Sequence, residues 1–228
     1  MIITFGLIEL SDCKVKTVRK QQIPFKDYKR IFSTIYSILQ SENAEINHSC
    51  IYFSVIGSFI LHEHYKLEPK VYMGIAAYML DEKQQNVLAF AEKNETQLFC
   101  SENGFHSWIV VNDWVIDFTA PLFPNMLKAM DKNASCEPKM FQKPLSDICT
   151  STAELKSNGD FFVHENIPFA NEMMDHFAKR PFNTDIAEIC CKWYRRPPVK
   201  MAKAISVGNG TGGLKQVQLK SYRIAGSW

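Results

Sequence analysis

The chain has 228 residues, long enough for one large domain or two small ones, and its 46% hydrophobic and 22% charged residues are typical of globular proteins. Its 26 basic and 24 acidic side chains leave a net charge of +2, which argues against a nucleic-acid-binding surface. The longest apolar run, residues 50–61, is too short to span a bilayer, and the N-terminus lacks the features of a signal peptide.

Two helices are expected in the first third of the chain. Apolar residues recur at helical spacing between Tyr28 and Leu39 and predict an amphipathic helix over 26–41. A polar loop follows, and Asn47 can cap a second helix from about 48 to 65. This second helix is apolar on most sides, so we expect it at the centre of the fold.

Strands are expected next, over 70–80 and 86–92, joined by a polar turn. The segment "GFHSWIVVNDWVIDFTAP", residues 104–121, supplies two more strands. A helix followed by consecutive antiparallel strands is typical of an α+β fold, with the central helix packed on an antiparallel sheet.

The remainder of the chain gives weaker signals. Residues 121–160 contain four prolines and are expected to be rich in loops. Helices are predicted over 168–179 and 184–193, and a last strand over 215–224. We treat 1–228 as a single domain whose core covers about 43–125, with 150–228 as a candidate C-terminal extension.

The segment 104–121 places two ionisable residues in an apolar hairpin. If Asn112 and Asp113 form a two-residue turn, His106 and Asp117 lie on the same face as diagonal neighbours with Cα atoms roughly 7–8 Å apart. Trp108 shares this face. A three-residue loop would put the two residues on opposite faces. Alone, each is expected to be a structural polar residue, but as a pair they form two-thirds of a nucleophile-activating triad.

Cys50 is the best candidate for the nucleophile. It stands at the start of the most apolar helix, where the helix dipole and the free N–H groups favour a thiolate and a developing oxyanion. The alternative is that Cys50 is a small buried hydrophobic residue, as free cysteines commonly are. We expect the other six cysteines to be structural or incidental, since none has this context.

The cysteine pattern also bears on the cellular compartment and on metals. Seven cysteines, with Cys190 and Cys191 adjacent, do not form an obvious disulfide framework, which indicates a reduced, cytoplasmic protein. No Cys-x-x-Cys pair occurs, and the two histidines of "HEHY" (62–65) have the wrong spacing for a helical zinc site, so no metal is expected.

The order of Cys50, His106 and Asp117, with "FHSWIVVNDWVIDFTAP" around the last two, resembles the core of the papain-like and transglutaminase-like superfamily. That superfamily includes arylamine N-acetyltransferases and many bacterial cysteine peptidases. The resemblance covers about 43–125 and is closest to an uncharacterised bacterial branch, a domain of unknown function.

The resemblance implies that Cys50 is the nucleophile, His106 the general base and then acid, and Asp117 the orienting group. It implies acyl transfer through a thioester, from a peptide, amide or acyl substrate to water or an amine, without a cofactor. The glutamine that papain-like members use in the oxyanion hole is missing between Gln40 and Cys50, which leaves Asn47 or Asn43 as substitutes. Trp108 is a candidate wall of the acyl pocket.

Three functions are compatible with these features. The first is a cysteine hydrolase or acyltransferase acting on an amide, isopeptide or thioester bond. The second is a catalytically silent binding domain of the same fold. The third is a toxin or effector that uses the triad on a host protein and recognises it through the C-terminal region. The sequence favours the first, without membrane or nucleic-acid partners, and leaves the oligomeric state open.

Overall fold

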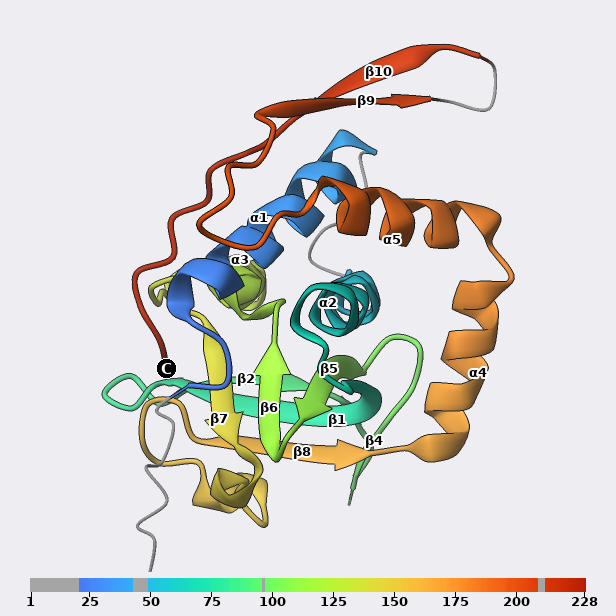
Figure 1. The fold of residues 1–228 in the computed structure, drawn as a ribbon. Coiled ribbons are helices and arrows are strands. Elements are labelled where there is room, and N and C mark those ends of the chain that lie inside the picture. Colours follow the sequence, from blue (N-terminus) through green and yellow to red (C-terminus); the bar gives the residue numbers. More distant parts are fainter. Residues whose placement is uncertain (1–20, 43–48, 96, 209–211) are drawn as a thin grey trace, which may run out of the picture.

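A computed structural model describes residues 21–42, 49–95, 97–208 and 212–228. A curled antiparallel sheet carries helices packed on it (Figure 1), so the expected mixed α+β fold is confirmed. No helix in these ranges is both long and apolar enough to cross a membrane.

Helices and strands alternate irregularly along the chain. In chain order they are α1 (Phe25–Ser41), α2 (Cys50–Tyr65), β1 (Lys70–Asp81), β2 (Asn86–Phe90), β3 (Glu92–Lys93), β4 (Leu98–Phe99), β5 (His106–Val111), β6 (Trp114–Asp117), α3 (Phe123–Met130), β7 (Phe141–Pro144), β8 (Phe161–Glu165), α4 (Ile167–Ala178), α5 (Pro181–Trp193), β9 (Ala204–Gly208) and β10 (Leu214–Gln218). Short 3₁₀ turns cover 120–122, 145–147 and 152–154.

The long strand β1 organises the sheet, whose order is β2-β1-β5-β6-β7 with β8 also paired to β1. Gly74 pairs with both β5 and β8, and Ala76 pairs with both β2 and β8. Since a strand has only two edges, β2 and β5 lie on the same edge of β1, one after the other. Residues 91–105 are therefore an excursion that leaves the sheet at the end of β2 and returns at the start of β5.

The predicted hairpin register is confirmed. Val111 pairs with Trp114 and Ile109 with Ile116, as a two-residue turn requires. Asn112 and Asp113 both have positive φ, 48° and 61°, which is typical of the tight turns that join antiparallel strands.

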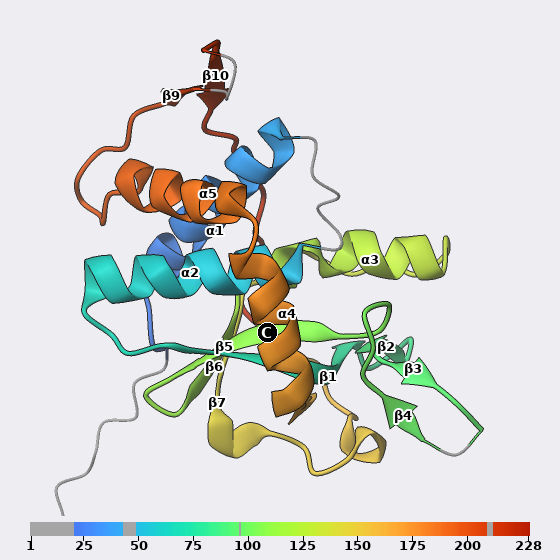
Figure 2. The same cartoon turned by 90° about the vertical axis from the view of Figure 1, so that its right-hand side faces the viewer.

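Helix α2 lies between the sheet and a second helical layer of α1 and α5 (Figures 1 and 2). Its approach to the hairpin depends on Gly57, because a Cβ there would lie 2.7 Å from Phe118 Cε2 and 3.3 Å from Ile109 Cδ1. The missing side chain lets α2 pack closely on β5. This contact positions the N-terminal end of α2, and Cys50 with it, relative to the hairpin.

Several predicted boundaries are corrected. Helix α2 begins at Cys50, with Ser49 at the N-cap position, and not near residue 48. The supposedly loop-rich segment 121–160 contains α3 and β7, and α3 is compatible with its proline because Pro124 lies in the first turn. For the same reason α5 begins at Pro181, ahead of the expected residue 184. The last strand ends at Gln218.

Residues after 150 are joined closely to the remainder of the fold. Strand β8 pairs with β1 over Gly74–Tyr78, and α5 packs on α2. The isolated β9–β10 hairpin projects beyond α1 and α5 (Figure 1).

Candidate active site

The hairpin brings His106 and Asp117 into direct contact. The Nε2 atom of His106 lies 2.6 Å from Oδ2 of Asp117, and neither side chain is exposed to solvent. Because Nε2 donates to the carboxylate, Nδ1 is the ring nitrogen left for a second partner. An aspartate in this position fixes the orientation and the tautomer of the imidazole.

Asp117 is itself held by three other groups. Its Oδ2 accepts a hydrogen bond from the Tyr78 hydroxyl at 3.0 Å, and its Oδ1 accepts one from the Thr119 backbone N–H at 2.8 Å. The hydroxyl of Tyr28, on α1, donates to the Asp117 carbonyl oxygen. Burial, followed by the charge of Asp117, raises the pKa of both phenols well above the ordinary value, so each keeps its proton and donates.

Aromatic rings enclose the imidazole of His106. Phe90 stacks on it with ring centroids 4.1 Å apart, and Tyr78 and Phe123 approach at 5.7 and 5.8 Å. Burial alone would lower the pKa of His106. The charge and hydrogen bond of Asp117, together with Cys50, more than reverse this and raise the pKa to about 9. The imidazole is therefore protonated at neutral pH.

Cys50 lies beside this pair. It is the first residue of α2, is 6% exposed, and interacts with His106 strongly enough to raise the pKa of the imidazole. The Nδ1 atom of His106 is buried and has no hydrogen-bond partner of good geometry among the described residues. Catalytic hydrogen bonds are often long without substrate, so this geometry is compatible with a thiol–imidazole pair.

A cavity of about 440 Å³ adjoins Cys50. Strand β2, the end of the 91–105 excursion and α3 form its walls, and Figure 2 shows these elements on the same side of the molecule. Its lining residues are Cys50, Leu88, Ala89, Phe90, Ala91, Glu102, Asn103, Gly104, Phe105, Met126, Ala129 and Met130. The candidate nucleophile therefore faces a space large enough for a small-molecule group.

Of the three supporting residues expected from the sequence, the structure describes only Trp108. Asn43 and Asn47 lie outside the described residues. Trp108, the candidate wall of the acyl pocket, does not line the cavity beside Cys50. It is 2% exposed, pairs with Tyr72 of β1 and stacks on that ring at 6.4 Å. Trp108 is two residues further along β5 than His106, which carries it away from Cys50.

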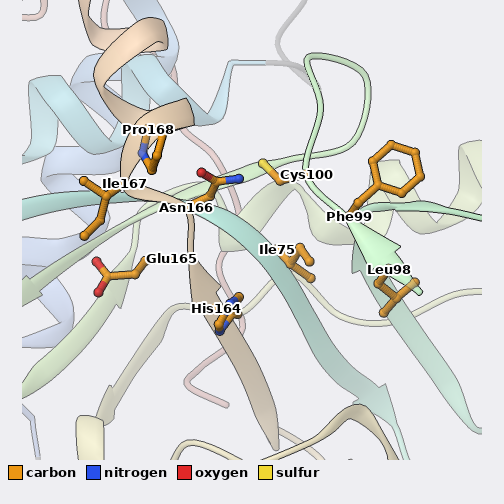
Figure 3. A pocket seen from close by; sticks show the side chains of 9 residues that line it. All are labelled: Ile75, Leu98, Phe99, Cys100, His164, Glu165, Asn166, Ile167 and Pro168. Atoms are coloured by element: carbon orange, nitrogen blue, oxygen red, sulfur yellow. The ribbon is translucent and has the colours of Figure 1, made fainter. Parts of the chain in front are cut away.

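A second pocket, of about 590 Å³, lies on another part of the same excursion (Figure 3). Leu98, Phe99 and Cys100 line one side, and residues 164–168 of β8 and the start of α4 line the other. It contains none of Cys50, His106 and Asp117. Burial raises the pKa of the Cys100 thiol to about 11, so this cysteine is a poor nucleophile at neutral pH.

Comparison with known proteins identifies the family. Residues 24–228 match the family model described as "Protein of unknown function (DUF2026)". The chain belongs to the DUF2026 family. A solved structure, "The crystal structure of genomics APC5867", is similar to this DUF2026 chain, with 34% identity and a TM-score of 0.83 over 93% of this chain and 100% of that one. A search of the curated proteins finds no match.

Sequence reasoning missed several residues of the site in this DUF2026 member. Phe90 and residues 102–105 adjoin the site because β2 and β5 are neighbours along β1, a relationship that only the strand pairing reveals. The turn residues of "SENG", which immediately precede His106, were an available signal. Nothing in the sequence pattern indicates Tyr28 as a site residue, because it lies on α1 and its hydroxyl donates to the carbonyl oxygen of Asp117 on β6.

Proposed function

We propose that this DUF2026 protein is a cysteine-dependent hydrolase or acyltransferase acting on an amide, isopeptide or thioester bond. The observation that carries the proposal is the buried His106, which is hydrogen-bonded to Asp117 on one side and interacts with Cys50 on the other. Each member has a distinct role: Cys50 is the nucleophile, His106 moves the proton and Asp117 orients His106.

The proposed reaction has two steps. In the proposed reactive state His106 carries a proton on Nδ1 and the Cys50 sulfur has given up its own. The Cys50 Sγ atom attacks the substrate carbonyl carbon, and the leaving group departs with the Nδ1 proton of His106. A thioester remains on Cys50. His106 then takes a proton from water or an amine, which attacks the thioester, and the Cys50 sulfur is released beside the reprotonated His106. The raised pKa of His106 favours the imidazolium that the first step requires.

The start of α2 is the proposed oxyanion site. The first N–H groups of a helix lack partners within the helix and point away from its N-terminal end. Cys50 is the first residue of α2, so its own backbone N–H is suited to bind the oxygen of a tetrahedral intermediate. Asn103 lines the same cavity and is a second candidate donor.

The arrangement supports a papain-like or transglutaminase-like core as the finer description of this α+β fold. A cysteine opens the central helix, and histidine and aspartate stand on two adjacent antiparallel strands. We extend the proposal to a peptide, amide or acyl substrate and to a reducing, cytoplasmic compartment, in which the thiol of Cys50 stays reduced.

An acyl-trapping experiment tests this function. The protein is mixed with p-nitrophenyl acetate, and intact-mass and peptide mass spectrometry locate the acetyl group. We expect acetylation of Cys50 in the wild type, none at this site in Cys50→Ala, and unchanged acetylation in the control Cys100→Ser. Added amine that shortens the lifetime of the acyl-enzyme and becomes acylated indicates transfer, whereas no effect of amine indicates hydrolysis. No acylation of Cys50 under any of these conditions would contradict the proposal.

A catalytically silent binding domain is the second candidate, and one observation favours it. His106 is fully buried and Cys50 is only 6% exposed, so access to the pair is narrow. A silent domain predicts that Cys50 reacts with small electrophiles no faster than an ordinary thiol, and that substitution of His106 leaves this rate unchanged.

A further inference from the structure

We infer that the cavity beside Cys50 accepts an apolar acyl group that carries a positive charge, as an apolar aminoacyl group with a free amine does. The inference rests on the proposed function and adds the substrate class. It is carried by three features of the cavity: its contact with Cys50, its apolar walls, and the single charged side chain on its rim.

The contact with Cys50 determines which part of the substrate occupies the cavity. After the leaving group departs, the acyl group remains bonded to the Cys50 sulfur and needs space next to it. The cavity that Cys50 lines has about 440 Å³, room for a side group of the size of an aromatic ring with its neighbouring atoms. The pocket of Figure 3 is not lined by Cys50 and cannot hold an acyl group in this way.

The walls are apolar on both sides. Strand β2 contributes Leu88 and Phe90, and α3 contributes Met126, Ala129 and Met130. Met130 is 69% exposed and leaves apolar surface at the mouth of the cavity. An apolar acyl group would cover this surface and gain from leaving water.

Glu102 gives the rim its charge. It is the one charged residue among the described residues that line the cavity, and it forms no ion pair with any described residue. The carboxylate is therefore available to a cation on the substrate and unfavourable to an anion.

The turn that presents Glu102 is well fixed. The Ser101 hydroxyl accepts hydrogen bonds from the backbone N–H groups of Asn103 and Gly104, at 3.2 and 3.1 Å. Gly104 also packs tightly, since a Cβ there would lie 2.5 Å from the Glu92 backbone nitrogen. The turn is thereby held against the start of the excursion, which fixes the backbone position of Glu102.

A series of affinity labels tests the inference. Three chloromethyl ketones share the phenylalanine side group and carry a free amine, an acetylated amine or a succinylated amine; a fourth has glycine with a free amine. In each, the Cys50 sulfur displaces chloride and forms a carbon–sulfur bond. The measurement is the second-order rate of Cys50 modification by mass spectrometry, with iodoacetamide as a reference that lacks a side group.

We expect the label with the free amine to react about fivefold faster than the acetylated label, and the succinylated label to react slowest. A difference in rate of about fivefold is the size of effect that one partly solvated charge pair produces. The phenylalanine label should react at least about tenfold faster than the glycine label. Glu102→Gln should remove the charge preference, while Glu95→Gln, on the same excursion but not lining the cavity, should retain it.

Ala129→Trp should reduce the preference for phenylalanine over glycine by filling the cavity from the exposed face of α3, and Lys128→Trp, also exposed on α3, should not. Iodoacetamide labelling should be unchanged in the two controls, Glu95→Gln and Lys128→Trp, and the rates of the four ketones are divided by the iodoacetamide rate of the same variant. If iodoacetamide labels an activated Cys50 but the four ketones react at similar rates, the inference is overturned and the proposed function stands. If Cys50 behaves as an ordinary thiol, unaffected by His106→Ala, both are overturned.

Discussion

The imidazole of His106 stacks on the ring of Phe90, with centroids 4.1 Å apart and planes inclined by 21°. The two residues are 16 positions apart in the sequence, yet they are neighbours because Phe90 pairs with Ala76 and His106 with Gly74 on the same edge of β1. Asp117 fixes one end of the ring through a hydrogen bond, and Phe90 covers one face of it. The imidazole is therefore held in orientation by two independent contacts.

Substitution of Phe90 by leucine should loosen this orientation. We expect Phe90→Leu to slow iodoacetamide labelling of Cys50 and to lower the free energy of unfolding by about 1 kcal/mol, the contribution of an aromatic pair. Phe99→Leu, an exposed aromatic residue in β4, is the matched control and should change neither quantity measurably. Unchanged labelling in Phe90→Leu would show that Asp117 alone orients the ring.

Removal of the Asp117 charge should reduce acylation without unfolding the chain. Asp117→Asn keeps the size of the side chain but cannot stabilise the protonated imidazole. We expect the rate of Cys50 acetylation by p-nitrophenyl acetate to fall on the order of 10²- to 10⁴-fold, the range for general acid–base groups. Asp113→Asn, in the turn of the same hairpin, should retain the wild-type rate.

The raised pKa of His106 predicts how stability depends on pH. The imidazole is buried, but Asp117 and Cys50 raise its pKa to about 9, above its ordinary 6.5. The folded chain therefore binds this proton more tightly than the unfolded chain. The resulting stabilisation, on the order of 3 kcal/mol, is complete below about pH 6.5 and is lost as the pH rises through 9.

Denaturant unfolding at a series of pH values measures this effect as the difference between wild type and His106→Gln. We expect the difference to decrease between pH 6.5 and 9. Titration of the His106 ring by NMR should give a midpoint near 9, and a lower one in Cys50→Ala because one group that raises the pKa is removed. A midpoint at or below 6.5 in the wild type would exclude the protonated imidazole.

Gly57 sets the approach of α2 to the hairpin. Gly57→Ala would force its Cβ against Phe118, and we expect a loss of about 1–3 kcal/mol of unfolding free energy, the usual cost of overpacking. Cys50 labelling should also slow, because the displaced helix carries Cys50. The control is Ser58→Ala, the next position on the same helix, which is only partly buried. A stable Gly57→Ala protein would contradict the role given to this contact.

The sequence predicted the local elements of the site well. The apolar alternation of 106–111 and 114–117, with Asn-Asp between them, determines the hairpin register, so the contact of His106 with Asp117 followed from spacing alone. The apolar run after Cys50 likewise predicted the central helix. In both segments, the pattern of residues that are close in the sequence determines the local structure.

The parts of the site that depend on contacts between distant segments could not be predicted. The excursion 91–105 adjoins Cys50 only because β2 and β5 share one edge of β1. The spacing of apolar residues in the sequence does not indicate which strands pair. Likewise, the shared face of Trp108 and His106 does not determine which cavity that face borders, and Trp108 does not line the one beside Cys50. Helix α3 lies where the prolines of 121–160 predict loops, because a proline in the first turn is compatible with a helix.

Iodoacetamide labelling of the cysteines as a function of pH, located by mass spectrometry in wild type and His106→Ala, is the first test of whether Cys50 and His106 form an activated pair. We expect Cys50 to label first and already at neutral pH, ahead of Cys100 and Cys149, whose pKa values are raised mainly by burial. We also expect His106→Ala to slow Cys50 to the behaviour of an ordinary thiol, with a pKa of about 8.5. A Cys50 that is inert in the folded protein, or that labels at the same rate in both proteins, would exclude such a pair and leave His106 and Asp117 as a buried structural pair.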